Sequence, residues 1–312
     1  LGRFGELTLS NGRRYTPTQV VAPGAEAAAL AAQHELNKIV LDDASTAQNP
    51  ANVPYPTGGL SAANSVRVGD SVINLTGTVY YGFNQYRIMP TQNVTFVNSN
   101  PRQAAPELSA VGNVKVASFN VLNYFNGDGA GNGFPTSRGA STAVEFAKQR
   151  DKIIAAISAM NADLVGLLEI ENDGFAEQSA IADLVRGLNE KAGADLWAFV
   201  DFNVAKVGTD EITSAMIYRK DKVVQAGVAS IGNAAPFDYG NRALISQSFK
   251  LEQSGELLNL TVVHLKSKGS CPSNKADLAN IDSGDGQGCW NGLRLQAATA
   301  MGNWLAGYPT GV

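Results

Sequence analysis

The chain has 312 residues, 44% of them hydrophobic, and its 24 basic and 28 acidic side chains give a formal net charge of −4. This length and apolar content are typical of a globular protein of one or two domains, and no run approaches the roughly 18 consecutive apolar residues of a membrane span. The acidic balance excludes a generally basic surface, so a nucleic-acid partner would have to be held by local cationic residues or a bound cation.

Strands dominate the first part of the chain. β-branched and aromatic residues between Gly, Asn and Asp turns predict strands at residues 4–9, 66–81 and 84–97. An Ala-rich helix is predicted over 24–37, followed by a strand at 38–41. Short strands with one inserted helix indicate a small β-barrel of the OB type over residues 1–97.

Four aromatic residues gather near the end of this region: Tyr80, Tyr81, Phe83 and Tyr86. Aromatic side chains on OB-type barrels can stack the bases of single-stranded nucleic acid. They also suit packing within a hairpin. Both interpretations stay open, and hairpin packing is the preferred one.

The segment N-S-N-P-R-Q-A-A-P-E-L-S-A-V-G-N at 98–113 is polar, contains proline and has no periodicity. Such a segment marks a boundary between structured regions. We therefore predict a linker here, with a second domain over 114–312.

Strands and helices alternate after this linker. Apolar runs predict strands at residues 114–121, 163–168, 197–202, 213–219, 242–250 and 257–265. Apolar residues at helical spacing predict helices at residues 143–160, 177–190 and 290–306. This order indicates an α+β domain in which helices cover two packed sheets.

Polar residues close three of these strands, and the third carries His264, one of two histidines in the chain. In the run T-V-V-H-L-K-S-K-G, the two-residue repeat of a strand would place His264, Lys266 and Lys268 on one face. Imidazole changes charge near neutral pH, and ammonium groups bind phosphate oxygens. The pattern favours a phosphodiester-cleaving site. The alternative is a solvated strand end.

The other two strand ends carry Asn120, in A-S-F-N-V-L-N-Y-F, and Glu169, in D-L-V-G-L-L-E-I-E-N. A carboxylate with few competing charges nearby is a typical ligand of Mg²⁺, which keeps most of its waters and uses one or two carboxylates. Glu169 is therefore a candidate metal ligand. The alternative is a buried carboxylate paired with Arg or Lys, and Glu171 is either a neighbour of the site or a surface acid.

Cys271 and Cys289 flank one polar loop. This placement predicts a disulfide in an oxidising compartment, with two unpaired thiols as the alternative. No second Cys pair or nearby His pair completes a zinc site.

Five segments in this order resemble the endonuclease/exonuclease/phosphatase superfamily, whose fold is deoxyribonuclease-I-like: S-F-N-V-L-N-Y-F, L-L-E-I-E-N, A-M-I-Y-R, N-R-A-L and V-V-H-L-K-S-K-G. The chain looks closest to the bacterial extracellular nuclease branch, in which an OB-like region precedes the catalytic domain. The resemblance implies a four-layer α/β/β/α sandwich after a small OB-like barrel.

The resemblance also implies roles for individual residues. Asn120 would orient the phosphate and the waters of the metal, and Glu169 would hold the divalent cation. His264 would donate a proton to the leaving oxygen or steady the phosphorane, with Asp210 as its partner acid. Arg242 would contact the scissile phosphate.

The lysines and the metal complete this picture. Lys266 and Lys268 match the H-L-K-S-K run of the branch and would neutralise phosphate charge. The implied cofactor is Mg²⁺, with Mn²⁺ or Ca²⁺ as alternatives.

The implied function is that of a secreted or periplasmic metal-dependent endonuclease that hydrolyses DNA, with RNA as a second substrate and no membrane partner. One alternative is a phospholipid or inositol-phosphate phosphodiesterase or phosphatase of the same fold, since fold does not dictate substrate. Another is a nucleic-acid-binding module without catalysis.

The chain departs from the superfamily pattern in one respect. Members carry a later strand ending in G-D-x-N and a final Asp-His pair, and neither occurs between His264 and Val312. The acids of this region, Asp277, Asp282 and Asp285, lie in a Gly/Ser-rich loop. We therefore expect the second domain to be truncated at its C-terminal end and these residues alone to be inactive or nearly so. The first domain begins in what looks like mid-strand, and we expect it to be truncated at its N-terminal end.

Overall fold

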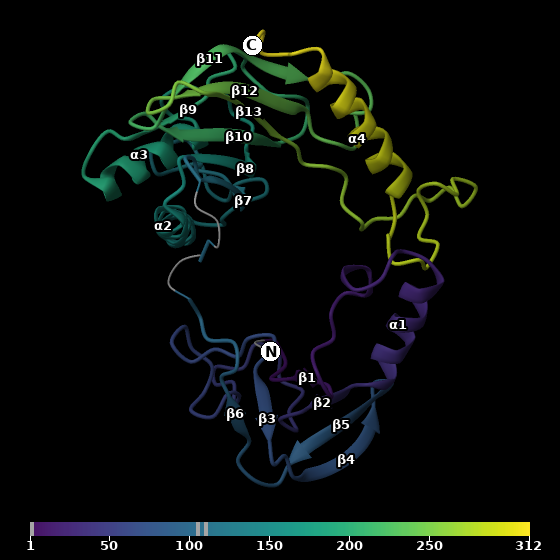
Figure 1. Cartoon of the computed structure of the whole chain (residues 1–312). Helices are drawn as coiled ribbons and strands as arrows, with labels where there is room; N and C mark the ends of the chain where they lie inside the picture. Colours follow the sequence, from purple (N-terminus) through teal and green to yellow (C-terminus); the bar gives the residue numbers. More distant parts are fainter. Residues whose placement is uncertain (1–2, 104–106, 109–111) are drawn as a thin grey trace. The chain divides into compact units, whose positions relative to one another are not determined.

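The computed structural model describes residues 3–103, 107–108 and 112–312. These residues form two compact units, one comprising 3–103 with 282–288 and the other comprising the remainder (Figure 1). The predicted linker 98–113 includes residues 104–106 and 109–111, which lie outside the described residues. The predicted domain boundaries therefore stay predictions.

The first unit contains a four-stranded sheet and a separate two-stranded one. The larger sheet has the order β1 (Leu7–Leu9), β2 (Ile39–Leu41), β5 (Gln85–Pro90) and β4 (Gly77–Gly82). Its β2 and β5 run parallel, and the other pairs are antiparallel. The smaller sheet pairs β3 (Ser71–Ile73) with β6 (Thr95–Val97). A short 3₁₀ helix, η1 (Pro17–Gln19), precedes helix α1 (Ala25–Leu36).

The OB-like barrel predicted for residues 1–97 is not supported. In the described residues β1 and β4 are the free edges of the larger sheet, and β3 and β6 pair with each other, so no strand closes the sheet into a barrel. The buried core of this unit is correspondingly small and centres on Leu41, Tyr55 and Val94.

The aromatic residues of the β4–β5 hairpin pack within the hairpin. The rings of Tyr81 and Tyr86 meet edge to face with their centroids 5.1 Å apart. The Arg87 guanidinium lies 4.9 Å from the centroid of the Phe83 ring, and the Tyr80 hydroxyl donates a hydrogen bond to Asp42. These contacts support the hairpin-packing interpretation.

Arg87 also anchors a buried ion cluster. Its Nη1 lies 2.7 Å from Asp42 Oδ2, and each side chain is 4% exposed; Glu6 contacts the same nitrogen. Burial alone would raise the pKa of Asp42, but hydrogen bonds from Arg87, Tyr80 and the Ala44 backbone hold it below its usual value. The charged pair is therefore part of the folded structure of this unit.

The second unit contains two sheets. The first has the order β7 (Val116–Tyr124), β8 (Leu164–Glu171), β10 (Ile212–Arg219) and β9 (Trp197–Phe199), with β7 and β8 parallel and the rest antiparallel. The second consists of antiparallel β11 (Val223–Gly232), β12 (Leu244–Leu251) and β13 (Leu257–Val262). The mixed α+β class is confirmed.

Alternate residues of β8 show how the layers pack. Val165 and Leu167 belong to the core formed with helices α2 (Ala143–Met160) and α3 (Ala180–Ala192). Leu164 and Leu168 face the other way, into the core shared with the second sheet. Helix α4 (Asn291–Ala306) packs in a further cluster with Leu244 of β12 (Figure 1). The layers thus run helices, sheet, sheet, helix.

The two helices on the first sheet have clear start signals. The Thr142 hydroxyl accepts a hydrogen bond from Glu145 N at the start of α2, and the Ser179 hydroxyl caps α3 in the same way. Such caps satisfy backbone donors that the helix leaves unpaired. None of the described helices combines the length and apolar character needed to cross a bilayer.

Two expectations for this unit were wrong. Strand β11 was not predicted, because its sequence V-V-Q-A-G-V-A-S-I-G is rich in small residues and kinks at Gly227, where φ is +68°. The strand before His264 was predicted to run to residue 265, but β13 ends at Val262. His264, Lys266 and Lys268 therefore do not alternate along one strand face.

Candidate active site

Three predicted site residues meet at one edge of the second unit. Asn120 Nδ2 donates a hydrogen bond of 2.9 Å to Glu169 Oε1, and the same oxygen lies 3.8 Å from His264 Nε2. Asn120 and Glu169 come from the parallel neighbours β7 and β8, whose carboxyl ends share one edge of the sheet, a usual place for a ligand site. The predicted convergence of the three side chains is present in the structure.

Glu169 occupies a bulge in β8. Asn120 pairs with Leu168 and Tyr124 with Ile170 on one side of the strand, and on the other side the pairing also skips from Leu168 to Ile170. Glu169 has a φ of +65°, a left-handed conformation that a non-glycine residue rarely adopts. The bulge frees the carboxylate from the ladder and returns Ile170 to the helix-covered core, as bulges beside functional sites commonly do.

Asn120 is held by a second irregularity, in β7. Its Oδ1 accepts a hydrogen bond of 2.8 Å from Leu122 N, and both Leu122 and Asn123 have positive φ. Gln149 of α2 donates to the carbonyls of Val121 and Leu122, which binds this bulge to the helix. The amide of Asn120 is therefore oriented with its nitrogen toward Glu169.

His264 is 18% exposed and stands against charged neighbours. Burial is the main cause that lowers its pKa, and the nearby Arg242 adds to this, while Glu169 and Asp210 act in the opposite direction. Its Nδ1 is buried and makes no hydrogen bond within the described residues. The Nε2 side of the ring faces Glu169 at 3.8 Å, and Nδ1 has no hydrogen-bond partner among the described residues.

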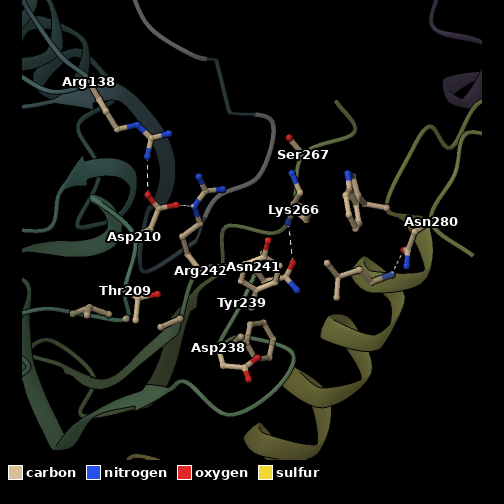
Figure 2. A pocket seen from close by; sticks show the side chains of 17 residues that line it. Arg138, Thr209, Asp210, Asp238, Tyr239, Asn241, Arg242, Lys266, Ser267 and Asn280 are labelled. Carbon is tan, nitrogen blue, oxygen red and sulfur yellow. Dashed lines mark hydrogen bonds and ion pairs between the residues drawn. The ribbon is translucent and has the colours of Figure 1, made fainter. Parts of the chain in front are cut away.

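The resemblance implied that Asp210 is the partner acid of His264, but the two side chains do not pair in the described residues. Its two oxygens contact two arginines instead, with Oδ1 2.7 Å from Arg138 Nη1 and Oδ2 3.1 Å from Arg242 Nε (Figure 2). A carboxylate that bridges two guanidiniums aligns both of them and leaves a net positive group. The role of Asp210 is therefore better described as the positioning of Arg242.

Sequence reasoning missed Arg138. It lies in the Gly-rich loop before α2, outside all five motifs, and is the first basic residue after Tyr124, with Lys148 the next. A single basic residue in a long loop without other cations was the signal that could have pointed to Arg138.

The two lysines take different positions. Lys266 lines the same cavity as Arg138 and Arg242, and its backbone nitrogen donates to Asn241 Oδ1 (Figure 2). Lys268 is exposed and is not among the described residues that line this cavity. The expected pair of phosphate-neutralising lysines is thus reduced to Lys266 at this place.

Glu171 is also separate from the site. Its Oε2 accepts a hydrogen bond of 3.3 Å from Asn126 N. Burial and the neighbouring Asp173 raise its pKa to about 7. It is neither a contact of Glu169 nor a simple surface acid.

Cys271 and Cys289 form the predicted disulfide, so the alternative of two unpaired thiols is wrong. The bond lies directly before Trp290, whose indole Nε1 donates a hydrogen bond of 2.9 Å to Ser270 O. The disulfide and this hydrogen bond thus join residues 270–271 to residues 289–290, directly before α4.

The donor set at this edge fits an ion that is mostly hydrated. In the part of the chain that the structure describes, no group of three His, Cys, Asp or Glu residues could hold a metal. Glu169 supplies one carboxylate, and Mg²⁺ commonly binds one or two carboxylates together with water and substrate phosphate. The residues fit Mg²⁺ or Mn²⁺ in that mode and do not fit an all-protein Ca²⁺ or zinc site.

Comparisons with known proteins cover parts of the chain. A family model described as a domain of unknown function (DUF8508) matches residues 6–100. No curated protein matches the sequence.

Two solved structures are similar to about half of the chain. One is the human Nocturnin catalytic domain with bound sulfate anion, at 15% identity and a TM-score of 0.32, covering 49% of this chain and 50% of that one. The other is an endonuclease/exonuclease/phosphatase family protein from Bacteroides thetaiotaomicron, at 17% identity and a TM-score of 0.34, covering 50% and 52%. The match thus spans about half the length of each. At this level of similarity the function has to be argued from the site itself, and superfamily membership stays a prediction.

Proposed function

We propose that the chain carries the site of a divalent-metal-dependent phosphodiesterase that acts on DNA, with RNA as a second substrate. The observation that supports this most is the meeting of Asn120, Glu169 and His264 at one sheet edge, joined by distances of 2.9 and 3.8 Å. The three residues are far apart in the sequence, and two backbone bulges are needed to bring the first two together.

Glu169 would hold Mg²⁺, or Mn²⁺ in its place. A divalent cation bound there supplies positive charge to the phosphate oxygens and lowers the pKa of a bound water. The Asn120 amide nitrogen donates a hydrogen bond to Glu169 Oε1, so it fixes the orientation of the Glu169 carboxylate. Its second N–H can donate to a phosphate oxygen. The bulge at Glu169 keeps the carboxylate out of the strand ladder.

His264 is the proposed proton donor. In the hydrolysis a water oxygen forms a bond to phosphorus and the bond from phosphorus to the leaving oxygen breaks. The protonated ring, an imidazolium, gives its proton to that oxygen and becomes neutral imidazole, and the proton lost by the attacking water restores the imidazolium. A positioned acid of this kind typically contributes about 10²–10⁴-fold to the rate.

Arg242 and Lys266 would oppose the negative charge that develops on the phosphate. Arg242 is held in place by Asp210, and Arg138 extends the same group. In a chain with a formal net charge of −4, this local concentration of cations is what a polyanionic substrate requires. We further propose an oxidising compartment, secreted or periplasmic, because the chain uses both of its cysteines in a disulfide.

Nicking of supercoiled plasmid DNA tests this function, because one cut per molecule is detectable even when turnover is slow. We expect Mg²⁺-dependent nicking that stops with a chelator and falls by at least about a hundredfold in His264→Ala and in Glu169→Gln. Nicking that survives the chelator or both substitutions would contradict the proposal, as would no detectable nicking in Mg²⁺ after prolonged incubation at high protein concentration, since slow turnover is what is expected of these residues alone. Release of phosphate from a phosphomonoester without plasmid nicking would favour a phosphatase.

A further inference from the structure

A cavity of about 710 Å³ opens beside the proposed catalytic residues and is lined entirely by the second unit (Figure 2). Arg242 lines the cavity, and its backbone nitrogen donates a hydrogen bond of 3.2 Å to His264 O, so this wall adjoins the proposed catalytic edge. Pockets that bind small molecules have volumes of roughly 300–1,000 Å³, so this cavity is large enough for one nucleotide.

Charged side chains line one part of the cavity. Cations predominate over acids: Arg138, Arg242 and Lys266 face Asp210 and Asp238, and Asp210 is already shared by the two arginines. Guanidinium and ammonium groups bind phosphate oxygens, so this part of the wall suits a phosphate.

Two exposed or half-buried aromatic side chains also line the cavity. Tyr239 is 86% exposed, which leaves its ring face free for a ligand, and Trp290 also lines the cavity. The Lys266 ammonium lies 5.2 Å from the centroid of the Trp290 ring. An exposed tyrosine and a tryptophan beside cations are the elements that proteins use to stack unpaired bases along a phosphate backbone.

Trp290 is held in this position by several bonds. Its indole donates to Ser270 O, its backbone nitrogen donates to Asn280 O, and the disulfide precedes it directly. Trp290 has a φ of +65°, an unusual conformation for a bulky residue. A large aromatic side chain fixed this firmly in a strained backbone, at the rim of a charged cavity, is typical of a binding position.

We propose that this cavity is a nucleotide subsite that receives one unpaired nucleotide next to the scissile phosphate, with its base against Trp290 and Tyr239 and its phosphate at Arg242. The substrate class is therefore single-stranded nucleic acid, or a strand that can release one base from its stack. This inference rests on the proposed phosphodiesterase function, since it takes the catalytic edge as the place where the strand continues.

Tryptophan fluorescence tests the stacking directly, with the whole chain in a chelator so that no hydrolysis occurs. The chain has three tryptophans. Trp197 is buried and Trp304 packs in the core under α4. Oligothymidylate should quench the fluorescence of the wild type and of the matched control Trp304→Phe, and should leave Trp290→Phe largely unquenched.

Affinity gives a second readout, from the anisotropy of fluorescein-labelled oligothymidylate. Trp290→Ala should weaken binding about 5- to 140-fold, the change that corresponds to roughly 1–3 kcal/mol of stacking per base. Trp290→Phe should restore most of the affinity, because a phenyl ring still stacks. A duplex of equal length should bind more weakly than the single strand.

Each outcome decides between the two proposals. Equal quenching in Trp290→Phe and wild type, or unchanged affinity in Trp290→Ala, would overturn the subsite. Equal binding of duplex and single strand would also overturn it. If no oligonucleotide binds while the plasmid is still nicked in Mg²⁺, the subsite is wrong and the phosphodiesterase stands. If stacking is seen and nicking never is, the subsite stands without the catalytic role.

Discussion

Gly166→Ala tests whether the spacing of the two sheets sets the geometry of the site. Gly166 lies on β8 three residues before Glu169, and Val262 lies at the end of β13 two residues before His264. A methyl group added at Gly166 would sit 2.7 Å from Val262 Cγ2, whereas ordinary contact begins at 3.4 Å, so the Val262 side chain or the strands that carry the two residues would have to shift by about 0.7 Å. Glycine in a strand often marks such a close approach.

Two opposing contributions set the expected change in the free energy of unfolding. Overpacking a core costs about 1–3 kcal/mol, and the loss of glycine flexibility returns about 0.5–1 kcal/mol. The net loss should reach about 2 kcal/mol, with a fall in Tm of about 2–4 °C for each kcal/mol. A misplacement of catalytic groups near 1 Å can cost on the order of a hundredfold in rate. The rate of plasmid nicking should therefore fall markedly even though the protein stays folded.

Calorimetry and plasmid nicking measure the two effects, with Gly302→Ala as the matched control. Gly302 lies inside α4, and a methyl group there meets no described atom within 4 Å. That control should gain about 0.5–1 kcal/mol and keep its activity. Adding Val262→Ala to Gly166→Ala should recover part of the lost activity. A Gly166→Ala variant with wild-type Tm and nicking rate would refute the reasoning.

Three further predictions concern other parts of the chain. Asp42→Asn removes one of the two carboxylates paired with the buried Arg87 and leaves Glu6 as the other, so it should destabilise the first unit in chemical denaturation by less than the roughly 3–5 kcal/mol of a fully unpaired buried charge; an unchanged midpoint would contradict this. Because the folded pKa of Asp42 lies below its usual 3.8, its contribution is fully present above pH 3.8 and should be lost as the pH falls through the depressed pKa, which circular dichroism during acid titration would follow. Reduction of the disulfide should remove about 3 kcal/mol and reduce the quenching of Trp290 by oligothymidylate, and quenching unaffected by reduction would argue against its role. Arg138→Ala should lower the slope of log affinity for oligonucleotide against log salt by about one, whereas Lys220→Ala, which removes a surface ion pair with Asp195, should leave it unchanged.

Much of the site was predictable because it depends on strand ends. Asn120 and Glu169 each close an apolar run, and they lie close together because β7 and β8 are parallel neighbours. His264 follows a strand of the other sheet, so its approach to Glu169 depends on how the two sheets pack. The helices were predictable for a similar reason, since apolar spacing and caps such as Thr142 are local signals. The disulfide followed from two cysteines around one polar loop.

The features that were missed depend on tertiary structure. The bulge at Glu169 has no local sequence signal. The run L-L-E-I-E does not alternate regularly between apolar and polar residues, so a break in the strand pairing leaves no visible change in its pattern. Arg138 reaches Asp210 across a loop whose path the sequence does not reveal. The barrel predicted for the first unit failed because short strands and turns do not specify which strands pair, and here β2 pairs in parallel with β5.

Glu169, with Asn120 and His264 beside it, is proposed to form one divalent-cation site. Electron paramagnetic resonance of Mn²⁺ titrated into the chain tests it most directly, because the measurement does not depend on turnover. Glu169→Gln should weaken the binding of Mn²⁺ by at least about tenfold, since even residues that only orient a ligand are worth about 10–100-fold. The exposed control Glu177→Gln should bind as the wild type does. Mn²⁺ binding of equal strength in wild type and Glu169→Gln would contradict the account.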